Sequence, residues 1–168
     1  MAEILPIASA GVAFLTSLGL GLWLRRLSPG GPEVRRISEA VREGALAFLK
    51  KEVSIILPLA AIILALVALF ISPYSALAFA VGGGLSILAG VISMLTCVSA
   101  APRAAVATGR GLGATLLASF RGGAVAGMVI TSMALFAVSA LYILIRDAVL
   151  IAGAGFGASL VALFIRAG

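Results

Sequence analysis

The sequence VSIILPLAAIILALVALFISPYSALAFAVGGGLSILAGVISMLTCVSAAP, from Val53 to Pro102, contains no Asp, Glu, Lys or Arg. A helix needs about 20 apolar residues to cross a lipid bilayer, so this stretch is too long for one crossing. It is interrupted at Ser72-Pro73-Tyr74-Ser75, a combination of residues typical of a tight turn. The stretch therefore predicts two membrane-spanning helices, residues 53–71 and 76–100, joined as a hairpin.

Similar uncharged runs on both sides of this stretch add three further spans. They cover residues 4–24, 122–145 and 148–165. The mean hydropathy of +1.26 and the hydrophobic fraction of 62% are well above those of soluble domains. We therefore expect an all-α, polytopic protein of the lipid bilayer, in which residues 1–168 form a single transmembrane helical region.

The basic residues predict how these spans are oriented. Of the twelve Lys and Arg residues, all except Arg146 fall on one side of the membrane: Arg25, Arg26, Arg35, Arg36, Arg42, Lys50, Lys51, Arg103, Arg110, Arg121 and Arg166. Positive residues favour the cytoplasmic side, so we expect a multi-pass protein of the cell membrane with its N-terminus outside and its C-terminus in the cytoplasm. Orientation and anionic lipid headgroups explain the net charge of +6, and no nucleic-acid partner is expected.

Residues 33–51 differ in kind from the spans. Apolar residues recur there at helical spacing, namely Val34, Ile37, Val41, Ala45 and Phe48, with charged residues between them. This pattern predicts a cytoplasmic amphipathic helix, which either lies on the membrane surface or packs on the cytoplasmic ends of the spans. We expect it to continue into the second span, where Pro58 should cause a bend.

Small residues at four-residue spacing predict that the spans pack closely. The third span carries Gly82, Ser86 and Gly90, the fourth carries Gly123 and Gly127, and the fifth carries Gly153 and Gly157. Residues without bulky side chains let helix backbones approach one another. A packed bundle is therefore favoured over separate helices that face only lipid.

The residues that usually carry chemistry are scarce. The chain has no His, no Asn and no Gln, its single Cys97 has no partner for a disulfide, and none of its six carboxylates lies inside a predicted span. Glu39 and Glu43 stand among arginines, as in a solvated, salt-bridged helix. Catalytic and metal-binding residues are therefore not expected within the chain.

The segment Gly109-Arg-Gly-Leu-Gly-Ala-Thr115 has a weak likeness to a phosphate-binding loop. It lacks the lysine of such loops and follows no predicted strand. A loop joining two helices, with interfacial arginines, is the favoured interpretation.

The fifth predicted span is patterned along its length. Small residues and one cation share a stripe, formed by Ala152, Gly155, Ser159, Ala162 and Arg166, and the other side carries Ile151, Leu160, Leu163 and Phe164. The stripe is either a tight packing face that ends in an interfacial arginine or the wall of a polar path. From these residues alone, the packing face is favoured.

Three segments of the chain, in order, resemble those of the membrane-bound pyrophosphate-energised ion pumps. They are Glu43-Gly-Ala-Leu-Ala-Phe-Leu-Lys-Lys-Glu52, Phe120-Arg-Gly-Gly-Ala-Val-Ala-Gly127 and Gly155-Phe-Gly-Ala-Ser-Leu-Val-Ala-Leu-Phe-Ile-Arg166. Small departures are Val53, where the family often has Tyr, and Ala167-Gly168, where it usually has Val-Gly-Gly-Gly. The resemblance extends over essentially the whole chain.

The resemblance implies a translocase that hydrolyses cytoplasmic pyrophosphate with Mg²⁺ and moves H⁺ or Na⁺ outward, as a homodimer with many more helices. The family's Lys- and Asp-rich substrate motif begins shortly after the position of Arg166, so we expect the chain to be an inactive N-terminal portion of such a pump. Arg166 and Ser159 match family residues beside the substrate funnel and ion entrance, which favours the polar path for their stripe. The resemblance fixes neither the pumped ion nor potassium dependence.

Two other interpretations remain open. The chain could be a stand-alone five-helix membrane protein with a packing or assembly role and no enzyme activity. It could also be a small unrelated transporter, although the lack of charged residues inside the spans argues against that.

Overall fold

The computed structural model describes residues 4–167, with the side chains of all of these except 150, 160, 161 and 163–167. This part of the chain consists of helices joined by short connections and contains no strand, which confirms the all-α prediction. The elements are α1 (Ile4–Arg25), α2 (Pro32–Phe70), α3 (Pro73–Ala107), the short 3-10 helix η1 (Thr108–Arg110), α4 (Leu112–Ile145) and α5 (Ala148–Ala167).

Four of the described helices are long and apolar enough to cross a membrane: α1, α2, α3 together with η1, and α4. Each contains one of the predicted spans. The fifth predicted span, residues 148–165, coincides with α5, several of whose side chains lie outside the described residues. Its crossing of the membrane therefore stays a prediction.

The turns between helices follow from local chemistry. At the predicted hairpin, the Ser72 side chain caps α3 by accepting a hydrogen bond from the Tyr74 amide at 3.2 Å, and Pro73 fills the first turn. Gly111, with a φ of 102°, lets the chain reverse between η1 and α4, because a residue without Cβ tolerates this conformation. The segment from Gly109 to Thr115 thus holds the end of η1, the connecting Gly111 and the first turn of α4, in agreement with the loop between two helices favoured from the sequence.

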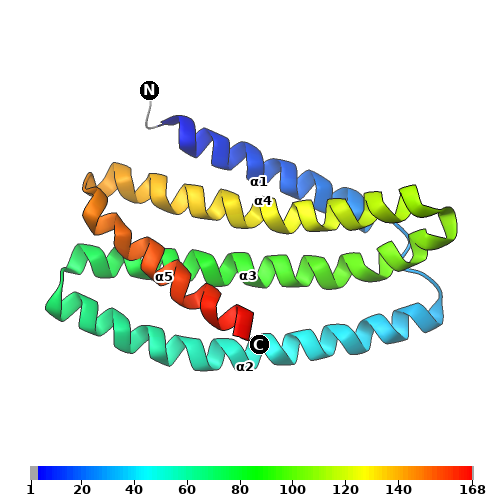
Figure 1. Ribbon diagram of the computed structural model, residues 1–168, viewed down its shortest axis with the longest axis horizontal. Coiled ribbons are helices and arrows are strands. Elements are labelled where there is room, and N and C mark those ends of the chain that lie inside the picture. Colours follow the sequence, from blue (N-terminus) through cyan, green and yellow to red (C-terminus); the bar gives the residue numbers. More distant parts are fainter. Residues whose placement is uncertain (1–3, 168) are drawn as a thin grey trace.

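The amphipathic segment and the second span form one continuous helix, α2, of 39 residues. At 1.5 Å per residue its length is about 58 Å, roughly twice the hydrocarbon thickness of a bilayer. The amphipathic half therefore extends the span as one helix, and α2 packs against α3, although Ile37 and Val41 of the amphipathic half remain exposed in the described chain. Pro58 lies inside α2, and Figure 1 shows that this helix is bowed along its length.

The helices run up and down beside one another, with α3 in the middle of the bundle (Figure 1). α3 packs against α2, α4 and α5, while α1 packs mainly on α4. One core cluster joins Ala78, Leu141, Ile151 and Ala154, and a second joins Ala89, Val125 and Val129 with Leu20 of α1 against it. The core is therefore built from α3 and α4, with α1 and α5 attached at different levels.

The prediction of close helix packing is confirmed for α3 with α5. A Cβ added at Gly82 would lie 2.7 Å from the Cα of Ala154, and one added at Gly153 would lie 2.7 Å from the carbonyl oxygen of Ser75. Gly157 likewise faces the backbone of α3. Backbone contact at this range requires residues without a side chain. Ser86 adds a hydrogen bond across the interface, donated by its hydroxyl to the carbonyl of Ala158 at 3.3 Å.

For Gly123 and Gly127, close packing against another helix stays a prediction. Both are exposed, and no atom within the described part of the chain lies within 4 Å of a Cβ added at either position. The close contact of α4 is made instead by Gly122, where an added Cβ would lie 2.7 Å from the Cβ of Ala100. A glycine-rich helix can carry small residues at four-residue spacing on more than one face. The spacing alone therefore does not predict which face packs against a neighbouring helix.

Candidate functional site

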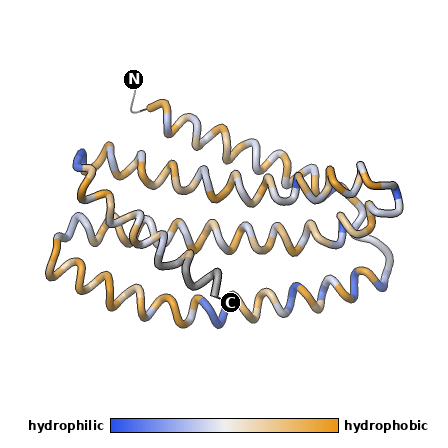
Figure 2. Tube along the Cα trace, viewed as in Figure 1, coloured by the Kyte–Doolittle hydropathy of each residue, from blue (hydrophilic) through white to orange (hydrophobic). Residues whose placement is uncertain are grey.

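The basic residues gather at one end of the bundle, which we call the basic end. α1 ends there, α2 begins there, and η1 joins α3 to α4 there, as the hydrophilic residues at this end of the tube in Figure 2 show. At the opposite end, Arg146 and Asp147 lie between α4 and α5. Lys50 and Lys51 lie halfway along α2, so charge is only partly segregated along the bundle, and the orientation of the bundle in the membrane stays a prediction.

A groove of about 770 Å³ opens at the basic end. Its polar lining comes from α1, α2 and α3: Arg25, Arg35, Ser38, Glu39, Arg42, Thr96, Ser99 and Arg103. Farther along the bundle its walls are apolar, with Phe14, Leu18, Leu22, Ile92, Leu95 and Val129 among the lining residues. The groove therefore changes from basic to apolar along the helix axes.

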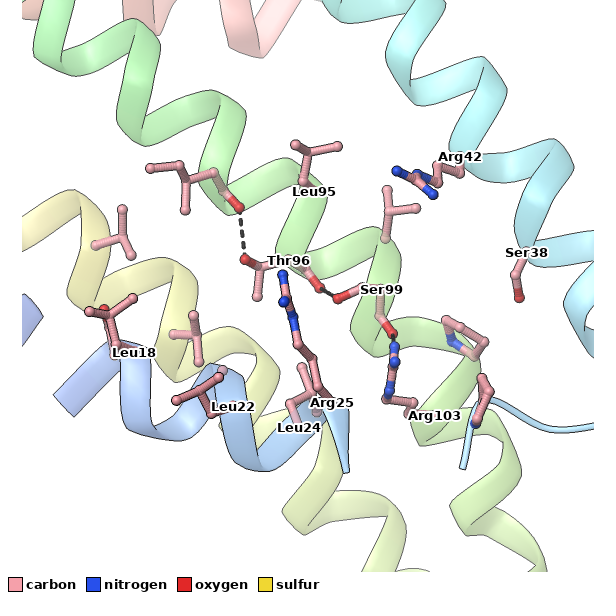
Figure 3. Close-up of a pocket in the computed structure, with 18 of the residues that line it drawn as sticks. Leu18, Leu22, Leu24, Arg25, Ser38, Arg42, Leu95, Thr96, Ser99 and Arg103 are labelled. Atoms are coloured by element: carbon pink, nitrogen blue, oxygen red, sulfur yellow. Dashed lines mark hydrogen bonds between the residues drawn. The ribbon is translucent and has the colours of Figure 1, made fainter. Parts of the chain in front are cut away.

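Helical spacing explains why these polar residues face one space. Arg35, Ser38 and Arg42 are three and four residues apart, so they share one side of α2. Thr96, Ser99 and Arg103 share one side of α3 for the same reason. Figure 3 shows Ser38 and Arg42 across from the α3 residues, with the Arg25 side chain extended beside Thr96. Three helices thus direct positive charge into one groove.

The arginines of the groove lack acidic partners. Four guanidinium groups and a single carboxylate, Glu39, line it, and within the described residues none of these arginines forms an ion pair. The salt bridges expected around Glu39 and Glu43 are absent among the described residues, so the arginines that line the groove keep their positive potential.

Arg103 is the most enclosed of the four arginines. Its Nη1 donates a hydrogen bond to the carbonyl oxygen of Ser99, one turn earlier on α3. Its Nε is buried and has no hydrogen-bond partner in the described part of the chain. A buried donor without an acceptor costs about 1–3 kcal/mol, so this Nε is an unusual feature of the interior beside the groove.

A cation–π contact holds α1 against α4 beside this groove. The guanidinium carbon of Arg121 lies 3.9 Å from the centre of the Trp23 ring. Arg121 belongs to the Phe120–Gly127 segment that carries part of the family resemblance. The contact gives this arginine a packing role that the sequence pattern did not reveal.

The predicted stripe on α5 faces away from the rest of the described chain. Ala152, Gly155, Ser159 and Ala162 are exposed, whereas Ile151, Ala154 and Gly157 on another side of the helix are buried against α3. The side chain of Arg166 lies outside the described residues. The helix therefore packs within the chain through a different face from the stripe, and the role of Ser159 and Arg166 stays a prediction.

No group of three or more His, Cys, Asp or Glu residues that could hold a metal ion is present among the described residues. The groove has one carboxylate among four arginines, which does not fit Mg²⁺, a cation that prefers several oxygen ligands. The magnesium implied by the resemblance is therefore not assigned to any residue of this part of the chain.

Membrane-length helices, backbone-close packing and a basic end define an integral membrane protein of the helical-bundle class. Comparison with known proteins gives its family: residues 11–168 match the family described as inorganic H⁺ pyrophosphatase. The chain belongs to this family.

Several curated relatives agree with this assignment. The chain is 41% identical over 142 residues to a K⁺-insensitive pyrophosphate-energized proton pump of Methanosarcina mazei, an alignment that covers 83% of the chain and 21% of the relative. It is 38% identical to a proton pump of Moorella thermoacetica described in the same words, with 98% and 26% covered. A putative K⁺-stimulated pyrophosphate-energized sodium pump of Bacteroides thetaiotaomicron is 32% identical, with 98% and 25% covered. The chain thus spans about a quarter of the length of these relatives.

Proposed function

We propose that this chain forms the N-terminal helices of a pump that hydrolyses pyrophosphate and moves H⁺ or Na⁺ out of the cytoplasm. The family match over residues 11–168 is the observation that carries the proposal. Identities of 38–41% to two relatives described as proton pumps, against 32% to one described as a sodium pump, favour H⁺. The remaining helices of the pump, and a second copy of it, would be the partners of this bundle in the membrane.

The proposal places pyrophosphate hydrolysis and its Mg²⁺ outside residues 4–167. Phosphoryl transfer needs positioned metal ions and charge stabilisation, which the residues described above do not supply. The contribution of the chain would then be structural support and one wall of the ion path. The exposed small-residue face of α5 supports this role, because a further helix can approach it closely.

The basic end is proposed to face the cytoplasm, by the positive-inside rule. Cysteine labelling tests this orientation in a Cys97→Ala background. Ile37→Cys on α2 and Tyr74→Cys at the hairpin are suitable positions, because these residues are 62% and 61% exposed. In right-side-out vesicles, a membrane-impermeant maleimide should label Tyr74→Cys and leave Ile37→Cys unmodified until the membrane is permeabilised. Labelling of Ile37→Cys in intact vesicles would contradict the orientation.

Arg166 is proposed to border the path of substrate or ion rather than to anchor α5 in lipid. We would replace the matching segment of the Methanosarcina mazei relative by this chain and measure pyrophosphate hydrolysis and ion uptake in vesicles. In this chimera, Arg166→Ala should lower either activity, or the coupling between them, by about tenfold or more, because a charge that acts on the path is lost. Arg110→Ala, which removes the same charge from the exposed η1, serves as the control. Equal activities of Arg166→Ala and the parent chimera would show that Arg166 is only an interfacial anchor.

A further inference from the structure

The groove at the basic end combines a cluster of arginines, unpaired among the described residues, with an adjoining apolar crevice, and helix packing alone requires neither. Arginines from three helices line it without forming ion pairs in the described part of the chain, and they adjoin an apolar crevice between α1 and α3. We propose that this groove binds an anionic phospholipid, with its phosphate held by Arg25, Arg42 and Arg103 and the upper part of one acyl chain along the crevice. The proposal does not depend on pumping.

The direction of the side chains supports a phosphate at this level. Side chains on a helix lean toward its N-terminus, so Arg25 and Arg103, near the C-terminal ends of α1 and α3, lean back from the basic end toward the apolar part of the groove. Figure 3 shows Arg25 beside Thr96 and Arg103 beside Ser99. The phosphate would accept hydrogen bonds from the guanidinium groups of Arg25 and Arg103, both of which line the groove.

The apolar walls of the groove favour a lipid over a soluble anion as its ligand. From Ile92 to Arg103 the α3 wall extends about 16 Å along the helix axis, with the arginine at one end and apolar residues at the other. Free phosphate or pyrophosphate would use only the arginine end and would leave Leu18, Leu22 and Leu95 exposed. A lipid headgroup with its attached chain covers both parts. Basic pockets between membrane helices on one side of the bilayer are suited to anionic headgroups.

The binding test uses the purified chain in detergent micelles. It would be titrated separately with dioctanoyl phosphatidylglycerol, dioctanoyl phosphatidylcholine and inorganic phosphate. Trp23, the single tryptophan of the chain, lies two residues from Arg25 and reports binding through its fluorescence. We expect saturable binding of phosphatidylglycerol, at least tenfold weaker binding of phosphatidylcholine, and no response to inorganic phosphate at equal concentration.

Variants locate the site. Arg25→Gln and Arg103→Gln should each weaken phosphatidylglycerol binding about tenfold or more, since each removes a charged hydrogen-bond donor. Arg103→Lys keeps the charge and should lose less than Arg103→Gln. Arg110→Gln changes the net charge equally but lies outside the groove, and it should bind like the parent chain. Circular dichroism checks that every variant retains its helix content.

Three results would overturn the proposal. They are the absence of saturable lipid binding by the folded parent chain, equal weakening by Arg110→Gln and Arg103→Gln, and binding of inorganic phosphate in preference to phosphatidylglycerol. The last of these would assign the arginines to a soluble anion instead of a lipid.

Discussion

Gly157→Ala is expected to destabilise the bundle by about 3 kcal/mol, a large change for a single added methyl group. The new Cβ would collide with the carbonyl oxygen of Phe79 and lie 3.1 Å from the amide nitrogen of Gly83. Both are backbone atoms of α3, so no side-chain rotation relieves the contact. The helices must move apart, which also disturbs the neighbouring Phe79–Phe156 ring contact and the hydrogen bond from Ser86 to Ala158. Gly82→Ala should behave similarly, because it meets the backbone of Ala154.

The matched control for Gly157→Ala is Gly155→Ala, on the same helix. At Gly155 an added Cβ meets no atom of the described chain within 4 Å, and alanine favours a helix more than glycine does. Gly155→Ala should therefore leave stability unchanged or raise it slightly. The measurement is the unfolding free energy of the purified chain in mixed micelles, from a titration with denaturing detergent. Equal stability of Gly157→Ala and Gly155→Ala would mean that α3 and α5 are not packed backbone to backbone.

The second large effect concerns activity. The purified 168-residue chain should release no phosphate from magnesium pyrophosphate, because the described residues hold no cluster of metal ligands. The same residues, placed in the chimera with the Methanosarcina mazei relative, should support hydrolysis. Reproducible turnover by the chain alone, lost on replacing Glu39 or Glu43, would contradict this account, because those carboxylates would then act in catalysis.

Much of the fold was predictable because the bilayer constrains it. The lack of charge from Val53 to Pro102, broken by Ser72-Pro73, predicts the α2–α3 hairpin almost to the residue. Close packing at Gly82, Gly153 and Gly157 was also predicted, although the pairing of α3 with α5 was not. Within the described chain α4 meets α3 through Gly122, which the spacing did not single out, and contacts of Gly123 and Gly127 stay a prediction. Which face of a helix meets a neighbour depends on the tilt and rotation of both helices. The spacing of small residues within one segment does not predict this tilt or rotation.

The candidate sites were harder to predict from the sequence than the fold was. The stripe that ends in Ser159 and Arg166 was recognised by its spacing and by the family resemblance, and its function stays a prediction. The groove was missed, because Arg25, Arg42 and Arg103 come from three separate helices and each alone resembles an ordinary interfacial arginine. The stripe of Thr96, Ser99 and Arg103 on α3 was a usable signal, since it places two hydroxyls and a cation on one side of the helix around the end of the predicted span.

The central claim is that this chain supplies part of the helical framework of a pyrophosphate-energised pump. Pyrophosphate-driven proton uptake by vesicles carrying the chimera tests it most directly, with the amount of chimera in the membrane measured alongside. The account predicts uptake and hydrolysis within about tenfold of the unmodified relative, a difference of about 1.4 kcal/mol in activation free energy. A chimera that inserts into the membrane in normal amount but shows neither hydrolysis nor uptake would contradict the claim and favour a stand-alone membrane protein.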